Sequence, residues 1–221
     1  TLNRPKALNA FSVRMRDELY EVLSAVRIDD EIRCVLFKGA GEKAFCAGAD
    51  LKEFLTVPSA VAAKRIRQVR DLWRLFLNVP QPLLAAMHGY VLGSGVEIAL
   101  FCDLRIASED VVFGMPEVSL GILPAAGGTQ TLPRYLGLSR ALDMLLTGRR
   151  ITGNEALECG MVSRLVPRDR LLQSAEEISL QIAALTPRVV QMAKKSVFDG
   201  IDMTLPQGLD LERRLAESCR K

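Results

Sequence analysis

The sequence predicts an α/β protein, and two observations lead to this class. Short apolar runs rich in β-branched residues alternate with segments of helical spacing through the first two thirds of the 221 residues. From about residue 134 onward the pattern is mostly helical. No fixed-period repeat, low-complexity segment or linker interrupts the chain. We therefore expect an α/β core over residues 1–135, followed by a mostly helical region over residues 136–221.

The expected elements follow one another in order. Residues 11–27 place apolar side chains at helical spacing and predict the first helix. Residues 32–38 and 82–87 are short apolar runs that predict buried strands. Between them, residues 59–78 predict a helix that ends before Pro80.

The second half of the core is marked by glycines. A glycine loop at residues 93–95 precedes a helix expected from about Glu97. Residues 105–107 and 111–113 are short and strand-like, and a further helix is expected to open at residues 127–130. The alternation of strands and helices therefore continues up to the predicted helical region.

Composition excludes several classes of function. Hydrophobic residues make up 49% and charged residues 25%, which is ordinary for a globular domain that needs no disulfides. A formal charge of +3 gives no reason to expect a nucleic-acid partner or an anionic membrane. Five scattered cysteines and one histidine, His88, argue against a metal centre and favour reduced thiols. No stretch is long and apolar enough to span a bilayer.

Two glutamates, Glu97 and Glu117, lie twenty positions apart, and each is embedded in apolar sequence. An ionised carboxylate is costly in such surroundings, and burial raises a carboxyl pKa toward neutrality. Both stand beside glycine-rich backbone, so they predict a pair that divides acid and base roles over one substrate. The alternatives are a salt-bridged glutamate in a packed turn for Glu97 and a surface glutamate on a rigid loop for Glu117.

Small residues in three turns would let a ligand approach the backbone closely. The segment 47–52 precedes a helix, and its free N–H groups could stabilise an oxyanion; alternatively, it is a tight turn capped by Asp50. The segment 89–97 places a second such turn before Glu97, and residues 113–128 supply the third. Phosphate-binding and serine-hydrolase motifs are absent from the sequence, and His88 is interpreted as a hydrogen-bonded core residue.

Taken together, these segments resemble the enoyl-CoA hydratase/isomerase (crotonase) family along essentially the whole chain. The resemblance rests on residues 3–10, 44–53, 89–97, 113–117, 121–130 and 146–148. It implies a spiral of ββα repeats with a C-terminal helical region used for trimerisation. It also implies a coenzyme A thioester as ligand and no separate cofactor, because coenzyme A is part of the substrate.

The resemblance also implies roles for particular residues. The backbone N–H groups of Ala49 and Ser94 would form the oxyanion hole, and Glu97 and Glu117 would activate and deliver water. Glu97 is assigned as the base and Glu117 as the acid, although the two can titrate as one coupled unit. The residues expected to contact the substrate are Lys6, Ala7, Ala47, Ala49, Asp50, Leu51, Lys52, Gly93, Ser94, Pro116 and Ala125. The acyl pocket is expected within residues 53–78, especially at Phe54, Leu55 and Trp73.

This sequence departs from the family pattern in two places. Ser94 stands where the family usually has a glycine, and its side chain could crowd the pocket although the backbone N–H is kept. The chain ends at Lys221, short of the usual C-terminal helices, and Thr1 does not read as a natural start, so we expect truncation. By the resemblance we expect a homotrimer or a dimer of trimers, in the cytoplasm of a bacterium or the mitochondrial matrix of a eukaryote.

Other reactions and functions are weighed against the hydratase. An isomerase of the family typically needs only the second glutamate, whereas a hydroxyacyl or carnitinyl thioester dehydratase needs both. One branch of the family binds RNA and carries a lysine-rich face on its first helix. Residues 11–27 contain no lysine, so the sequence favours an enoyl-CoA hydratase without a nucleic-acid or membrane partner.

Overall fold

The computed structural model describes residues 1–54 and 70–219, and its named strands form two sheets of four strands each. In the first sheet all neighbours are parallel, in the order β1 (Val35–Lys38), β3 (Leu83–Met87), β5 (Leu104–Ser108) and β8 (Arg164–Val166). The second has the order β2 (Ala44–Cys46), β4 (Tyr90–Leu92), β6 (Val112–Gly114) and β7 (Ile151–Thr152), with only the last pair antiparallel. Strands β1 to β6 thus alternate between the sheets, and the predicted α/β class is confirmed.

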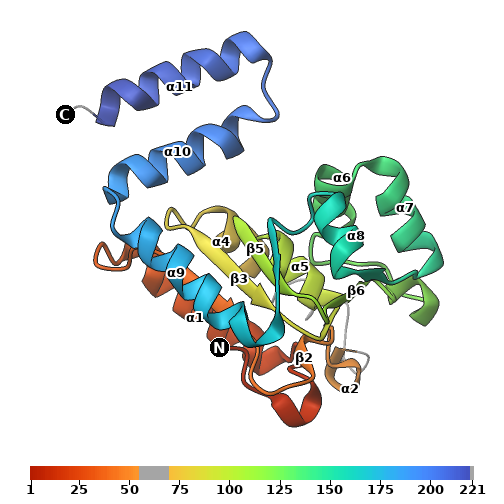
Figure 1. Cartoon of the computed structure of the whole chain (residues 1–221). Coiled ribbons are helices and arrows are strands. Elements are labelled where there is room, and N and C mark those ends of the chain that lie inside the picture. The colour runs from red at the N-terminus through yellow and green to blue at the C-terminus, as the bar shows by residue number, and fades with distance from the viewer. Residues whose placement is uncertain (55–69, 220–221) are drawn as a thin grey trace.

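Helices cover both sheets (Figure 1). In chain order they are α1 (Val13–Ile28), α2 (Leu51–Phe54), α4 (Leu72–Leu77), α5 (Ser94–Leu100), α6 (Gly128–Leu136), α7 (Leu138–Thr147), α8 (Gly153–Glu158), α9 (Leu171–Ala183), α10 (Pro187–Gly200) and α11 (Leu205–Cys219). Three 3-10 turns are also present: η1 (Pro5–Ala7) precedes α1, η2 (Glu117–Leu120) lies between α5 and α6, and η3 (Arg168–Arg170) lies between α8 and α9. Of the helix expected over 59–78, residues 59–69 lie outside the described residues, and α4 forms its C-terminal part.

Both faces of the first sheet are buried. All five residues of β3 are buried, and they alternate between two clusters as the period of a strand requires. Leu83, Ala85 and Met87 belong to the main core between the sheets, whereas Leu84 and Ala86 pack with residues of α9. This explains why strand β3 is a continuous apolar run in the sequence rather than an alternating one.

The segment after residue 135 contributes strands as well as helices. Strand β8 pairs with β5, and Arg105 of β5 donates a hydrogen bond of 2.5 Å to the carbonyl of Met161. Strand β7 in turn pairs with β6. Strands from both sides of residue 135 therefore take part in both sheets. The division of the chain at this residue stays a prediction.

Helices α10 and α11 project away from the core (Figure 1), and neither has a buried residue. Helix α10 is attached through Lys194, whose ammonium group lies 2.7 Å from Asp103 Oδ2 and 3.0 Å from the carbonyl oxygen of Gln81. Both side chains of this ion pair are mostly buried. The ion pair and the contact with Gln81 therefore connect the middle of α10 to the residues that precede β3 and β5.

Candidate active site

A cavity of about 430 Å³ contains both glutamates of the predicted pair. Six residues predicted from the sequence contribute to its lining, namely Ala49, Leu51, Ser94, Glu97, Glu117 and Ala125. Trp73, predicted for the acyl pocket, also lines it. Leu55 and the side chain of Phe54, predicted for the same pocket, lie outside the described residues.

Glu97 is held deep in this cavity by two backbone amides. It belongs to α5 and is only 2% exposed. Its Oε1 accepts hydrogen bonds from the N–H groups of Ala126 at 3.0 Å and Gly128 at 2.9 Å. Burial raises the pKa of Glu97 to about 7 although these amides oppose the shift, and the charge of Glu117 raises it further. A carboxyl group with this pKa can take up or release a proton near neutral pH.

The close approach of the second amide depends on a glycine. A Cβ atom at Gly128 would lie 3.0 Å from Glu97 Oε1 and 2.6 Å from Cε of Met115. A side chain here would push the carboxyl group away from the amides. These contacts span about thirty residues in sequence, and sequence reasoning missed the amides of Ala126 and Gly128 as partners of Glu97.

Glu117 is the less constrained of the two acids. It opens η2 directly after Pro116, and it is 9% exposed. Its Oε2 is buried and has no hydrogen-bond partner among the described residues. Burial raises its pKa above the ordinary value of 4.5. Because a buried polar atom is costly to leave unpaired, Oε2 is the atom through which Glu117 would bind a ligand.

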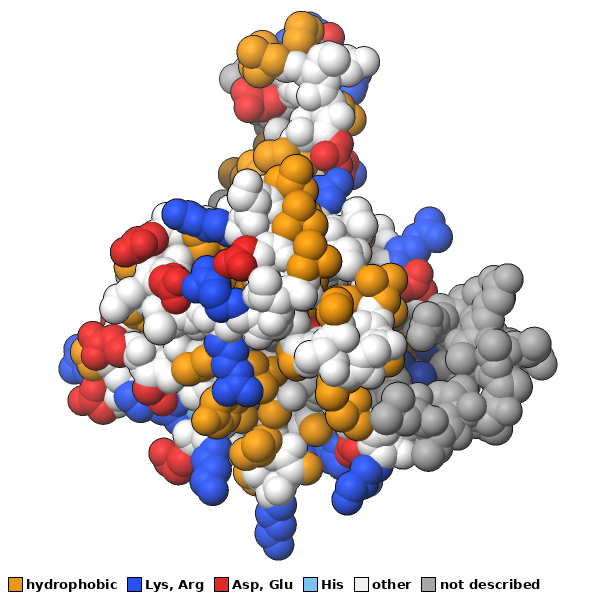
Figure 2. Space-filling model, turned by 90° about the vertical axis from the view of Figure 1, so that its right-hand side faces the viewer, with side chains coloured by type: hydrophobic (Ala, Val, Ile, Leu, Met, Phe, Trp, Pro, Cys, Tyr) orange, Lys and Arg blue, Asp and Glu red, His pale blue; other side chains and the backbone are white. Residues whose placement is uncertain are grey.

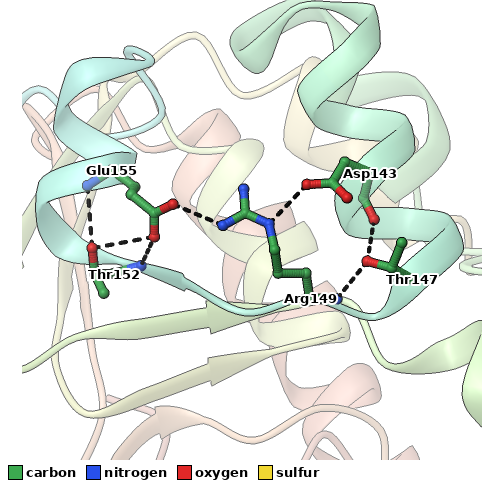
Figure 3. A network of polar contacts seen from close by, with 5 residues as sticks. All are labelled: Asp143, Thr147, Arg149, Thr152 and Glu155. Carbon is green, nitrogen blue, oxygen red and sulfur yellow. Dashed lines mark hydrogen bonds and ion pairs between the residues drawn. The ribbon is translucent and has the colours of Figure 1, made fainter.

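Strand β6 ends shortly before Glu117, and its pairing partner is β7. A polar network connects α7, the turn that precedes β7, and α8 (Figure 3). The guanidinium group of Arg149 lies 2.7 Å from Asp143 of α7 and 2.7 Å from Glu155 of α8. Thr152 and Glu155 form a capping box at the start of α8. The network joins α7, the turn before β7 and the start of α8, and β7 pairs with β6, which ends three residues before Glu117.

The two predicted oxyanion turns touch each other. A Cβ at Gly93 would lie 3.5 Å from Cα of Gly48, and both glycines have positive φ angles, of 49° and 100°. Ser94 is the first residue of α5, so its N–H has no acceptor within the helix. The amide of Ala49 donates to no backbone acceptor in the described part of the chain. Since Ala49 and Ser94 both line the cavity, each turn brings an available donor to it.

The remaining predicted substrate contacts do not line this cavity. Lys6 and Ala7 are exposed in η1, and this turn lies beside residues 47–52 because the N–H of Ala47 donates to the carbonyl of Leu8 at 3.0 Å. Asp50 forms an ion pair with Arg4 at 2.9 Å. Gly93 and Pro116 lie next to cavity residues: a Cβ at Gly93 would meet Glu117 Oε1 at 2.5 Å. The other predicted contacts outside the lining are Ala47 and Lys52.

Several lining residues were missed by sequence reasoning. Phe11 precedes α1 and Arg16 lies in its first turn. Arg70 precedes α4, and Leu72 is the first residue of that helix. Arg16 and Arg70 already contact acidic side chains of α1. The spacing of these two arginines does not indicate a cavity, because charged residues on a solvent-exposed helix face have the same spacing.

Fold and site together define an α/β protein with one cavity lined by two buried carboxyl groups and by residues of two adjoining turns. The family model described as enoyl-CoA hydratase/isomerase matches residues 1–221. The chain belongs to this family and has the crotonase fold.

Individual relatives agree with this assignment. A Bacillus subtilis protein named putative enoyl-CoA hydratase/isomerase YngF is 42% identical over 98% of this chain and 84% of its own length. A Dictyostelium discoideum protein named probable mitochondrial enoyl-CoA hydratase is 40% identical over 99% of this chain and 78% of its own. The crystal structure of an enoyl-CoA hydratase from Bacillus anthracis is 40% identical and superposes with a TM-score of 0.91 over 97% of this chain and 83% of that one.

Neither a metal site nor a membrane segment is found among the described residues. No group of three or more His, Cys, Asp or Glu side chains there could hold a metal ion. No helix within residues 1–54 and 70–219 is long and apolar enough to cross a membrane.

The raised pKa of Glu97 has a consequence for stability. Its folded-state pKa of about 7 exceeds the ordinary 4.5. The contribution of Glu97 to the free energy of unfolding is therefore fully present below pH 4.5 and is lost as pH rises through 7. Glu97→Gln removes this dependence. We expect the variant to be more stable than the unmodified protein at pH 8, by roughly 2–3 kcal/mol, and nearly equal to it at pH 4.5. Urea unfolding at both pH values measures the difference, with the exposed Glu176→Gln as control. If the difference in the free energy of unfolding between Glu97→Gln and the unmodified protein does not change with pH, the assigned pKa is contradicted.

Proposed function

We propose that this protein is an enoyl-CoA hydratase, a lyase that adds water across the 2,3 double bond of an enoyl-CoA thioester and gives the 3-hydroxyacyl thioester. One observation carries the proposal: two buried carboxyl groups share a cavity with available amides from two adjoining turns. Membership of the family supports the thioester as substrate. Breakdown of fatty acids or related acyl thioesters is the process in which this reaction would serve.

The two turns would supply electrophilic activation. In the proposed complex, the N–H groups of Ala49 and Ser94 donate hydrogen bonds to the thioester carbonyl oxygen. Polarisation of the carbonyl makes Cβ electrophilic, and the same donors stabilise the enolate that forms when water adds. The proximity of Gly48 and Gly93 supports this role, because it brings the two donors toward one point.

The two acids would divide the proton transfers. Glu97, oriented by the amides of Ala126 and Gly128, accepts a proton from the attacking water. Glu117, with Oε2 unpaired among the described residues, supplies a proton to Cα. Addition of water to the double bond involves no net oxidation or reduction of the enoyl thioester. The two acids and the backbone donors therefore suffice for the proposed chemistry, and no redox cofactor is needed. The pKa of Glu97, about 7, suits proton transfer near neutral pH, and burial raises the pKa of Glu117 as well.

The position of Glu97 also bears on the alternatives. An isomerase that used only Glu117 would have no need of a second carboxyl group buried in the same cavity and fixed by two amides. A dehydratase uses the same groups in reverse and is distinguished only by its preferred substrate. No lysine lies on α1, which disfavours the RNA-binding alternative.

The coenzyme A portion would lie along the surface formed by η1 and residues 47–52, while the acyl chain enters the cavity near Trp73. We also propose self-association as a trimer or a dimer of trimers. Exposed leucines on α7 and α8 support it, namely Leu138, Leu142, Leu146 and Leu157, and Figure 2 shows several hydrophobic groups on the side of the molecule turned to the viewer. Light scattering of the purified protein would test this: a monomeric mass would contradict it.

The test of function is turnover. Loss of the conjugated enoyl absorbance would be followed with crotonyl-CoA and with thioesters of increasing chain length. We expect hydration of at least one short or medium substrate, and its absence with all of them would refute the proposal. The compartment is proposed to be the cytoplasm in a bacterium or the mitochondrial matrix in a eukaryote, the latter in line with the mitochondrial name of one relative. Cell fractionation would test it.

A further inference from the structure

Ser94 carries a hydroxyl group into the cavity beside Glu97. It is the first residue of α5, and Glu97 follows three positions later, so the two side chains lie on the same face of the helix. Both are buried, at 7% and 2% exposure, and both line the cavity. The role proposed above for Ser94 uses only its backbone N–H, so the side chain has no assigned task.

We propose that the Ser94 hydroxyl is a positioning group for Glu97: it binds the carboxylate form and holds it where it can accept a proton from water. This inference rests on the proposed hydratase function for its catalytic meaning. The geometry supports it in a specific way. The amides of Ala126 and Gly128 both bind Oε1 from the side of α6. Ser94 lies three positions before Glu97 in α5 and lines the same cavity, so its hydroxyl group would bind the carboxyl group from a second element.

The electrostatic surroundings explain why such a group matters. Burial is the largest influence on Glu97 and raises its pKa, and the charge of Glu117 acts in the same direction. The buried thiol of Cys46 in β2 is the other titratable group that interacts with Glu97 in the described part of the chain. The amides of Gly128 and Ala126 and a side-chain hydrogen bond from Ser94 lower the pKa. Hydrogen bonds to the charged form are the only opposing influence.

The test compares Ser94→Ala with the unmodified protein, because alanine removes the hydroxyl and keeps the backbone N–H. We expect the acid limb of the pH–rate profile for hydration to move upward by roughly one pH unit. The rate should fall several-fold near pH 6.5 and much less at pH 8.5. Ser108→Ala, at a buried serine that does not line the cavity, is the matched control and should leave the limb in place.

A second measurement needs no activity. Urea unfolding would be followed from pH 5 to pH 8 for Ser94→Ala, Glu97→Gln and the double variant. The stability lost by Ser94→Ala should grow as pH rises through 7, and this growth should vanish in the Glu97→Gln background. If Ser94→Ala proves too unstable to measure, Ser94→Gly serves in its place.

The outcomes separate the two proposals. A stability loss that is the same at all pH values, or that persists in the Glu97→Gln background, overturns the role of the hydroxyl whatever the protein catalyses. Hydration by the unmodified protein with an unmoved acid limb in Ser94→Ala overturns it as well. Absence of hydration in the unmodified protein refutes the proposed function, while the unfolding experiment still decides the role of Ser94.

Discussion

Replacement of Glu97 or Glu117 by glutamine is expected to lower kcat for enoyl-CoA hydration by roughly 10²–10⁴-fold, with little change in KM. Glutamine keeps the size of the side chain, and its carbonyl oxygen can still accept the hydrogen bonds of Ala126 and Gly128 at position 97. What disappears is the ability to take up or release a proton. Steady-state kinetics with crotonyl-CoA would measure the loss.

Two controls make this result specific. Glu176→Gln changes an exposed glutamate of α9 and should keep full activity. The double variant Glu97→Gln/Glu117→Gln should lose far less than the product of the single losses, because groups that serve one reaction act as a unit. Near-normal turnover in either single variant would contradict the assigned roles.

The second large effect is expected from Gly95→Ala. A Cβ atom at this position would lie 2.3 Å from the carbonyl oxygen of Cys46 and 2.9 Å from its Cβ, both in β2. The backbone cannot yield cheaply here, since Gly95 is buried in α5 between two cavity residues. We expect a loss of about 3 kcal/mol or more in the free energy of unfolding.

Activity should fall with it, because α5 carries Ser94 and Glu97 while β2 leads into the turn of Ala49. Moving the helix away from the strand would separate the two donors of the proposed oxyanion hole. Gly200→Ala is the matched control: its nearest neighbour outside the helix would be 4.0 Å away, and alanine favours a helix. The control should be neutral or stabilising, and a Gly95→Ala variant of normal stability and rate would refute the packing argument.

Much of the core could be predicted from sequence because the signals are local. The helix expected over residues 11–27 is α1, and the apolar run at 82–87 contains β3, which is buried on both faces. The glycine loop at 93–95 and the helix after it were also predicted, and α5 begins at Ser94. In each case the residues themselves contain the spacing or the turn chemistry that specifies the element.

Residues 105–107 and 111–113 were predicted to be strand-like, and they overlap β5 and β6. Strands β2, β4 and β8 were missed, because a run of three residues gives only a weak signal. Strand β2 lies directly before a segment interpreted as a turn, β4 lies within another such segment, and β8 lies within the stretch interpreted as mostly helical. They are strands because parallel neighbours distant in the chain supply their hydrogen bonds. Such pairing leaves no mark on the local sequence.

The same limit applies to the site. Glu97 and Glu117 stood out because charge in apolar sequence is a local anomaly, and the structure places both in one cavity. The amides that bind Glu97 come from a loop about thirty residues away, and backbone donors have no sequence signature. Asp50 was expected to contact substrate, yet its carboxylate faces Arg4, a pairing that only the fold determines.

The sequence distance between paired strands constrains how this chain is made. Strand β5 lacks its neighbour β8 until about sixty further residues have left the ribosome, and β6 must likewise wait for β7. Contacts of such long sequence separation slow folding and leave strand edges open to other nascent chains. A polypeptide interrupted before residue 151 would present two incomplete sheets at once, each without the last strand of its order.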